Sequence, residues 1–279
     1  MIDDHVHLWT RSLVRSSESA QAALAYFRAS EEDLPRTLDD LVEDLHEASV
    51  RKAFLLAMDC GESDQEALRN LTVRNEEVGE AVREHPDLFV GFAGIDPRRS
   101  KALDYFGDAI GSLELTGLKF HASAIQVRPD DKQLMYPIYR KAQELQVPII
   151  HHTGTTALGS CLIHYARPIY FDEVAQAFPD VRMLLAHFGW PWMEECFAVL
   201  MRNPNLYTDI SGWLPKYLPE AMVTMINGPL KERTLVGSDY PMIKPSSWRE
   251  DFNRSLKPRL KEGVSEKLLM QNALSFLRP

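Results

Sequence analysis

The sequence is poor in cysteine and has no long hydrophobic run, and each absence excludes a class of protein. Its three cysteines, Cys60, Cys161 and Cys196, are too few and too widely spaced for a disulfide framework or a Cys-x-x-Cys metal site. We expect them to be small buried apolar residues. No apolar run reaches about 18 residues, the length expected of a membrane-spanning helix.

Basic charge is also scarce, since 31 basic residues face 40 acidic ones and the net charge is −9. Neither a nucleic acid nor an anionic membrane surface is therefore expected as a partner. No charged-then-apolar segment opens the chain, so we expect a cytoplasmic protein without a signal peptide. The expected partner is a small-molecule substrate, and a homo-oligomer remains an open alternative.

Short apolar stretches recur along the chain and alternate with amphipathic stretches of helical length. We expect strands at 2–8, 52–58, 88–95, 116–121, 147–152, 181–187, 205–211 and 233–238. The clearest expected helices lie at 65–85, 99–114, 131–146, 190–203 and 217–227. Alternation of this kind predicts parallel strands, and eight such units close into a (β/α)₈ TIM barrel. No linker divides the chain, so we expect one α/β domain over residues 1–279.

Two connections, 9–50 and 153–172, are longer than a plain loop. Both follow the carboxyl end of a predicted strand, which is the side where barrel enzymes build their active sites.

The first predicted strand contains His5 and His7, two residues apart. Residues with this spacing in a strand project to the same face, so the two imidazoles can bind one cation. Further histidines and an aspartate close other predicted strands: His152, His187 and Asp239. The carboxyl ends of these strands meet at one mouth of a barrel, which predicts a metal site with an open coordination position.

Four segments together resemble the amidohydrolase-2 branch of the amidohydrolase superfamily. They are Asp3-Asp4-His5-Val6-His7-Leu8-Trp9, Pro148-Ile149-Ile150-His151-His152-Thr153-Gly154, Ala186-His187-Phe188-Gly189-Trp190-Pro191-Trp192 and Val236-Gly237-Ser238-Asp239-Tyr240-Pro241. The resemblance implies that His5, His7, His152 and Asp239 bind a divalent metal and that His187 acts on the substrate or on the water. It also selects His152 over His151, which we expect to point into the helical layer or to orient a neighbour.

The ligand set of three histidines and one aspartate makes zinc the expected metal, although manganese, iron and cobalt fit the same ligand types. Asp239 could also take the proton of the water, which makes it a catalytic candidate together with His187. A second metal, bridged by a carboxylated Lys119 as in binuclear relatives, is the less favoured alternative.

Substrate-binding candidates follow other strands. Lys119 and His121 end the fourth predicted strand, where Lys119 could bind a carboxylate or carbonyl group. Arg167, in the long loop after the fifth strand, is a candidate for binding an anionic group, and Trp213 could line an aromatic-accepting pocket. Three segments together resemble a subgroup associated with bacterial breakdown of hydroxyphenyl β-ketoacyl thioesters: Ser211-Gly212-Trp213-Leu214-Pro215-Lys216-Tyr217, His152-Thr153-Gly154-Thr155-Thr156 and Arg167-Pro168-Ile169-Tyr170.

These features leave three functions open. The first is a metal-dependent hydrolase whose activated water cleaves an ester, lactone, amide or activated carbon–carbon bond of a small organic acid or thioester, including aromatic ones. The second is a metal-dependent, non-oxidative decarboxylase of an aromatic or enolic acid. The third is a metal-binding barrel without catalysis, and the presence of His187 beside a complete ligand set argues against it.

Overall fold

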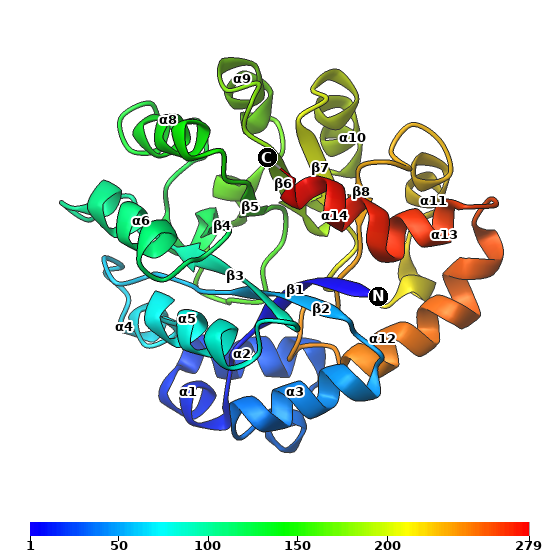
Figure 1. The fold of residues 1–279 in the computed structure, drawn as a ribbon, viewed down its shortest axis with the longest axis horizontal. Helices are drawn as coiled ribbons and strands as arrows, with labels where there is room; N and C mark the ends of the chain where they lie inside the picture. Colours follow the sequence, from blue (N-terminus) through cyan, green and yellow to red (C-terminus); the bar gives the residue numbers. More distant parts are fainter. Residues whose placement is uncertain (279) are drawn as a thin grey trace.

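The computed structural model, which describes residues 1–278, contains eight parallel strands that pair in sequence order (Figure 1). They are β1 (Ile2–His7), β2 (Lys52–Leu56), β3 (Phe89–Gly94), β4 (Gly117–His121), β5 (Ile149–His152), β6 (Met183–Ala186), β7 (Leu206–Asp209) and β8 (Thr234–Leu235). Backbone hydrogen bonds from Asp4 N to Val236 O (3.0 Å) and from His7 N to Tyr240 O (2.9 Å) join the last strand segment to β1. The predicted single-domain (β/α)₈ barrel is confirmed.

Helices surround the strands on the outside of the barrel (Figure 1). They are α1 (Arg11–Ser16), α2 (Glu18–Phe27), α3 (Leu38–Glu47), α4 (Glu66–Arg69), α5 (Asn75–Glu84), α6 (Ala102–Gly111), α7 (Ala122–Ile125), α8 (Met135–Leu145), α9 (Tyr170–Ala177), α10 (Met193–Arg202), α11 (Glu220–Ile226), α12 (Pro245–Asp251), α13 (Val264–Glu266) and α14 (Asn272–Leu277). In residues 1–278, no helix combines the length and the apolar character that a membrane span requires.

Two regions differ from the sequence predictions. The connection 9–50, for which no helix was predicted, folds into α1, α2 and α3. Helix α3, for example, begins after Thr37, whose hydroxyl accepts a hydrogen bond from Asp40 N (3.4 Å). The helix expected at 65–85 is interrupted between α4 and α5, because Val73 pairs with Met58 through two backbone hydrogen bonds of 2.9 and 3.0 Å.

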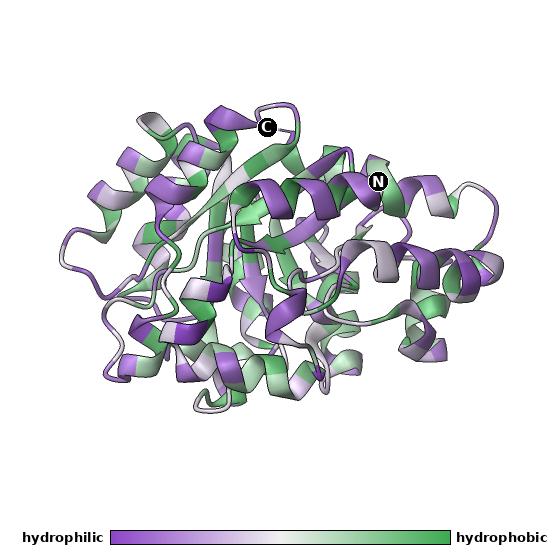
Figure 2. Ribbon diagram, turned by 90° about the horizontal axis from the view of Figure 1, so that it is seen from below, coloured by the Kyte–Doolittle hydropathy of each residue, from purple (hydrophilic) through white to green (hydrophobic). Residues whose placement is uncertain are grey.

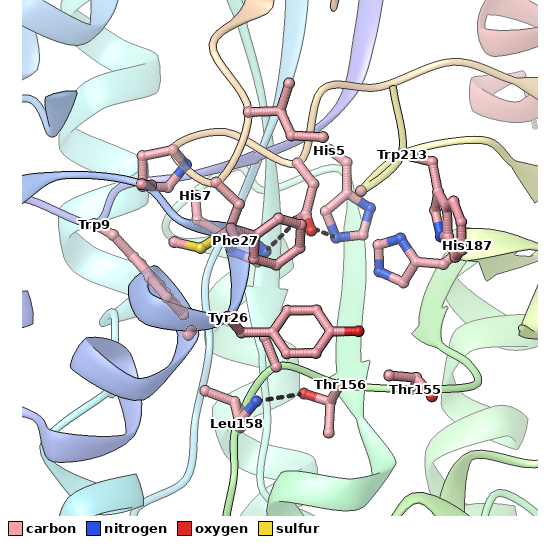
Figure 3. A pocket seen from close by; sticks show the side chains of 18 of the residues that line it. His5, His7, Trp9, Tyr26, Phe27, Thr155, Thr156, Leu158, His187 and Trp213 are labelled. Atoms are coloured by element: carbon pink, nitrogen blue, oxygen red, sulfur yellow. Dashed lines mark hydrogen bonds and ion pairs between the residues drawn. The ribbon is translucent and has the colours of Figure 1, made fainter. Parts of the chain in front are cut away.

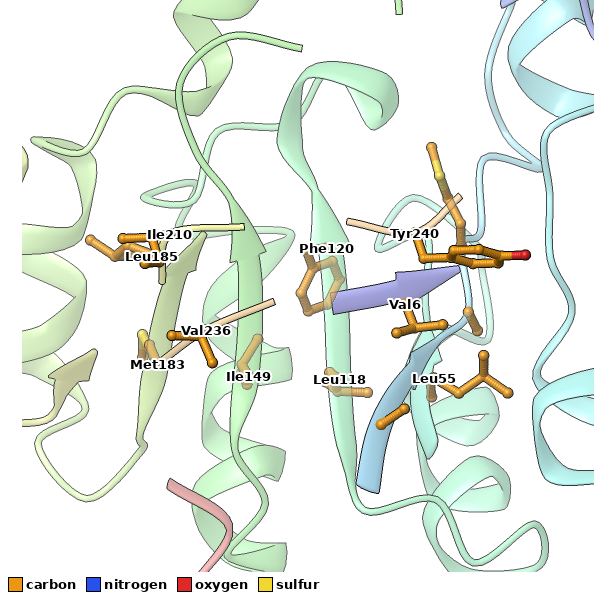
Figure 4. Close-up of a cluster of buried hydrophobic side chains, with 14 of the residues drawn as sticks. Val6, Leu55, Leu118, Phe120, Ile149, Met183, Leu185, Ile210, Val236 and Tyr240 are labelled. Carbon is orange, nitrogen blue, oxygen red and sulfur yellow. The ribbon is translucent and has the colours of Figure 1, made fainter. Parts of the chain in front are cut away.

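The strands bury both faces, as strands covered by helices do. Side chains such as Leu55, Phe120 and Leu185 point outward and pack in the layer between barrel and helices (Figure 4). Figure 2 shows hydrophobic residues on the strands and hydrophilic ones mainly on the outer helix faces. All three cysteines are buried and free, as expected.

The barrel interior near the N-termini of the strands is filled by a separate apolar cluster. Its members come from the strands and from α14, which lies across this end of the barrel near the N-terminus (Figure 1). They are Ile2, Phe54, Leu56, Phe92, Ile150, Leu184, Ala186, Leu235, Ala273 and Phe276. The opposite end of the barrel is left for polar side chains.

Candidate active site

A cavity of about 750 Å³ opens at the carboxyl end of the strands. Its floor is polar and contains side chains from five strands or the residues that follow them: His5, His7, Lys119, His121, His152, His187 and Asp239. The sequence therefore predicted correctly which side of the barrel would collect these residues.

A β-bulge in β1 turns both of its histidines toward this cavity. Asp3 pairs with Ala53 and Val6 pairs with Leu55, so Asp4 and His5 together face a single residue of β2. Ile2 belongs to the inner apolar cluster, whereas Val6 lies in the outer layer. Without the extra residue, the period-two alternation that starts at Ile2 would place His5 and His7 on the outside.

Three metal-type donors converge on one point of the floor. Asp239 Oδ1 lies 3.6 Å from His7 Nε2 and 3.8 Å from His5 Nε2. Donors that share one tetrahedral zinc ion at the usual bond lengths lie about 3.4 Å apart, so this trio fits a divalent metal. His5 Nδ1 and His7 Nδ1 are buried without a hydrogen-bond partner in the described residues.

Lys119 reaches the same point from β4. Its Nζ lies 2.9 Å from His5 Nε2, and the side chain is buried. Burial lowers the pKa of Lys119 to about 8, although the carboxylates of Asp239, Asp209 and Asp4 act in the opposite direction. A metal bound to His5 Nε2 would displace the Lys119 amine from this nitrogen.

His152 and His121 form a stacked pair on the next part of the floor. Their ring centroids are 3.9 Å apart and their planes differ by 9°. His152 Nε2 lies 3.1 Å from Thr155 O, a carbonyl that can only accept, so this nitrogen carries a hydrogen. His152 is therefore outside the trio of converging donors, and its assignment as a metal ligand stays a prediction. His121 Nε2 contacts Thr156 Oγ1 at 3.1 Å, and burial lowers the pKa of His121 to about 3.

His187 follows β6 and lies next to the donor trio. Its ring centroid is 4.8 Å from those of His5 and His152. His187 Nδ1 is held by Ser211, at 3.0 Å from the carbonyl oxygen and 2.9 Å from Oγ. The ring is thus fixed through one nitrogen, which leaves Nε2 for the cavity.

Asp209, at the end of β7, is a site residue that the sequence reasoning missed. It is fully buried, and its Oδ1 accepts hydrogen bonds from His187 N (2.8 Å), Ser211 N (2.9 Å) and Ser211 Oγ (2.7 Å). The signal that selected His152 and His187, a polar residue closing a predicted strand, applies equally to Asp209. The motifs that carry the family resemblance do not include Asp209.

Asp4 was missed for a different reason. The bulge turns its carboxylate into the barrel below His5, where both oxygens are buried without a hydrogen-bond partner in residues 1–278. Burial and the neighbouring charges of Asp209 and Asp3 raise the pKa of Asp4. A bulge cannot be recognised from the strand pattern alone.

Aromatic side chains form much of the cavity wall (Figure 3). Trp9 follows β1, Tyr26 and Phe27 come from the end of α2, and Trp213 follows β7. Trp213 also packs at 5.4 Å, between ring centroids, against Trp190, another wall residue. The sequence pattern does not predict the wall contribution of α2, because it indicates only a long connection at 9–50.

Arg167 lies outside the cavity, contrary to its predicted place in the substrate site. Within the described chain, it is not among the lining residues; its Nη2 lies 2.5 Å from Glu195 Oε2 and its guanidinium sits over the ring of Trp192. The loop directs Arg167 toward α10, where Glu195 neutralises its charge. Lys119, His121 and Trp213 do line the cavity, and their contact with substrate stays a prediction.

His151 points away from the cavity into the helical layer, as the sequence suggested for the neighbour of His152. It stacks on Phe120 at 5.5 Å and contacts Phe171 and Tyr139. Both ring nitrogens lack a hydrogen-bond partner in the described residues. Burial and the charge of Lys119 lower the pKa of His151 to about 3.

Comparison with solved structures gives matches over nearly the whole chain. A TIM-barrel protein from Bordetella bronchiseptica matches with 24% identity and a TM-score of 0.80, covering 99% of this chain and 98% of the other. A 5-carboxyvanillate decarboxylase from Sphingomonas paucimobilis matches with 15% identity and a TM-score of 0.71 over 100% and 98% of the two chains.

A dihydroxybenzoic acid decarboxylase from Polaromonas, solved with bound manganese and 2-nitroresorcinol, matches with 17% identity and a TM-score of 0.69 over 99% and 96%. Among curated protein sequences, none matches this chain significantly. The family model for amidohydrolases (the amidohydrolase-2 branch) matches residues 2–278. The chain therefore belongs to the amidohydrolase family.

Proposed function

We propose that this protein is a metal-dependent hydrolase of a small, aromatic organic acid or its thioester. The observation that carries the proposal is the position of His187, a fixed imidazole beside the trio of His5, His7 and Asp239. A metal centre used only for binding has no need of a proton acceptor at its open side. Membership of the amidohydrolase family supports the same conclusion.

A divalent metal held by His5, His7 and Asp239 would polarise a carbonyl group and lower the pKa of water to about 7. Zinc is our first expectation, with manganese, found in two structural neighbours, as the main alternative. One ion is expected and a second is not.

The side chains around this point supply the remaining chemistry. Ser211 engages Nδ1 of His187, so Nε2 accepts the proton of the attacking water. Lys119 donates a hydrogen bond to the oxygen that becomes negative when the water adds to the carbonyl carbon. The bond to the leaving group then breaks, and His187 Nε2 returns its proton to that group.

The cavity fits an aromatic acid. Its volume of about 750 Å³ suits a small molecule, and its wall offers the rings of Trp9, Phe27 and Trp213. Arg28 at the lining adds positive charge, which suits a carboxylate or thioester with an anionic tail, whereas Lys244 is paired with Asp33, also at the lining, at 3.7 Å.

Non-oxidative decarboxylation is the second candidate, because the decarboxylases from Sphingomonas and Polaromonas share this fold. In that reaction the bond between the ring carbon and the carboxylate breaks, carbon dioxide leaves and a proton is added to the carbon. Asp239, on the cavity floor, is the candidate for delivering that proton.

Metal content tests the site directly. Purified protein should contain about one tightly bound divalent ion per chain, and a His5→Ala/His7→Ala double variant should lose it. The matched control is a His46→Ala/His85→Ala double variant, which also removes two histidines but outside the cavity and should keep the ion. Full metal retention in the His5/His7 variant would refute the ligand assignment.

Product analysis separates the two reactions. Protein loaded with zinc or manganese is incubated with aryl esters, lactones and β-ketoacyl thioesters, and in parallel with hydroxybenzoates. We expect release of acid from the first group. Release of carbon dioxide alone would overturn hydrolysis in favour of decarboxylation, and no turnover of either group would favour a binding protein.

A further inference from the structure

We infer that Asp209 is a positioning residue that fixes which ring nitrogen carries the hydrogen in both His5 and His187. Its catalytic consequence rests on the proposed function, but the hydrogen-bond evidence does not. The two histidines come from β1 and from the end of β6, and the carboxylate of Asp209 on β7 faces both.

The first step concerns the hydroxyl of Ser211. This hydroxyl has one hydrogen, and Asp209 Oδ1 lies 2.7 Å away and can only accept it. The same Oδ1 accepts the backbone N–H groups of His187 and Ser211, so it is an acceptor and the hydrogen of Ser211 points at it. Toward His187, the Ser211 oxygen is therefore an acceptor.

The hydrogen of His187 follows from this. Nδ1 lies 2.9 Å from Ser211 Oγ and 3.0 Å from the Ser211 carbonyl oxygen. Since both neighbours accept, Nδ1 must donate, and the neutral ring then has its lone pair on Nε2. The backbone is held as well, because Asp209 Oδ1 accepts the His187 N–H while His187 adopts a φ of 62° in the left-handed region.

His5 is fixed from the other oxygen of the same carboxylate. The ammonium of Lys119, which only donates, lies 2.9 Å from His5 Nε2, so this nitrogen carries the lone pair. The ring hydrogen is then on Nδ1, which faces Asp209 Oδ2 at 3.5 Å. Asp209 Oδ2 has no hydrogen-bond partner in residues 1–278, so His5 is the group to which it is available.

The buried carboxylate of Asp209 thus favours a lone pair on Nε2 of both His5 and His187, and the two lone pairs have different roles. The lone pair of His5 Nε2 faces the donor trio, where it is suited to a metal, and the lone pair of His187 Nε2 is suited to accept a proton. Replacing Asp209 by Asn should weaken the first. The three donors at Oδ1 would hold the amide oxygen, and the amide N–H₂ would then face the His5 Nδ1–H, donor against donor. Lys119 alone would then favour a hydrogen on Nδ1.

The test is nitrogen NMR of the histidine rings in metal-free protein, with His5→Asn and His187→Asn used to identify the signals. In the wild type, both residues should show a protonated, pyrrole-type Nδ1 and an unprotonated Nε2. Either residue with its hydrogen on Nε2 would overturn the inference without any Asp209 variant, so misfolding cannot obscure the result.

Two variants then isolate Asp209. In Asp209→Asn, part of the His5 population should shift its hydrogen to Nε2, and the affinity for added zinc or manganese should fall about 10- to 100-fold. Asp4→Asn is the matched control, because Asp4 is an equally buried carboxylate near His5 that accepts no side-chain hydrogen bond in the described residues. It should leave both tautomers unchanged.

The same shift in Asp4→Asn, or unshifted His5 signals in folded Asp209→Asn, would overturn the inference. Because these readouts need no turnover, an inactive protein with the expected tautomers would contradict only the proposed function.

Discussion

The two ends of the barrel are made from the same strands but bury opposite kinds of side chain. Near the strand N-termini, Ile2, Phe54 and Phe276 belong to an apolar cluster. At the other end, His5, Asp4 and Asp209 are equally buried, and each has a polar atom without a hydrogen-bond partner in residues 1–278. The β-bulge at Asp4 and His5 marks the change from one kind of interior to the other.

This difference implies that the apolar end mainly determines stability and the polar end mainly determines activity. A buried polar atom without a partner costs about 1–3 kcal/mol, so the polar end destabilises the fold in the absence of a ligand. The apolar end has to offset that cost through burial of side chains such as Phe276. Substitutions at the polar end should therefore change mainly the reaction rate, and substitutions at the apolar end mainly the free energy of unfolding.

The largest effect is expected at the polar end, on rate. His187→Asn removes the proton acceptor but none of the three converging donors, so kcat should fall about 100- to 10,000-fold. Metal content and the melting temperature should stay close to those of the wild type. A folded variant that loses its metal would instead identify His187 as a ligand.

The complementary change is Phe276→Ala at the apolar end. Phe276 is fully buried and packs against Phe54 and Tyr207, with ring centroids 6.4 and 5.3 Å away. Its truncation should lower the free energy of unfolding by about 3–5 kcal/mol, measured by denaturant titration. The rate per folded molecule should not change. Leu274→Ala, on the exposed face of α14, is the control and should shift stability by less than about 0.5 kcal/mol.

Much of this division was predictable from the sequence, because barrel geometry places every strand end on one side. The confirmed alternation of strands and helices was enough to gather Lys119, His152 and Asp239 at one mouth. The bulge that turns His5 inward could not be predicted, since an extra residue in one strand leaves no mark on the hydrophobic pattern.

Side chains from the long segments between strands were the least predictable part of the site. Tyr26 reaches the cavity because the connection 9–50 folds into helices whose packing depends on distant residues. Arg167 turns away because Glu195, 28 positions later, is brought beside it. Sequence spacing alone does not indicate either encounter.

A smaller effect separates the two histidines of β5. His151 lies in an apolar environment and burial lowers its pKa to about 3, so below the ordinary value of about 6.5 the unfolded chain binds its proton more readily. The neutral His151 therefore does not reduce the free energy of unfolding at neutral pH. As the pH falls from 6.5 toward 3, the unfolded chain takes up the proton and the free energy of unfolding decreases. At pH 5 the loss should be about 2 kcal/mol.

His151→Leu should remove this share of the acid sensitivity when unfolding is measured at pH 7 and at pH 5. The exposed His46→Gln serves as control and should leave the pH dependence unchanged. An unchanged dependence in His151→Leu would mean that His151 is already solvated in the native state.

The smallest effect is expected for Arg167→Ala, which tests whether a charged residue outside the cavity contributes to substrate binding. Arg167 forms a partly exposed ion pair with Glu195, and such a pair contributes less than about 1 kcal/mol. Stability should fall by no more than that, and KM should not change. Glu195→Gln should have the same small effect, because it breaks the same pair.

Lys119→Met, at the cavity floor, provides the contrast in the same assay. A charged hydrogen bond to substrate contributes about 1.5–3 kcal/mol, so its loss should raise KM or lower kcat/KM at least about tenfold. A comparable rise in KM for Arg167→Ala would mean that the loop after β5 moves over the cavity when substrate binds. Arg167 would then belong to the substrate site only when substrate is bound.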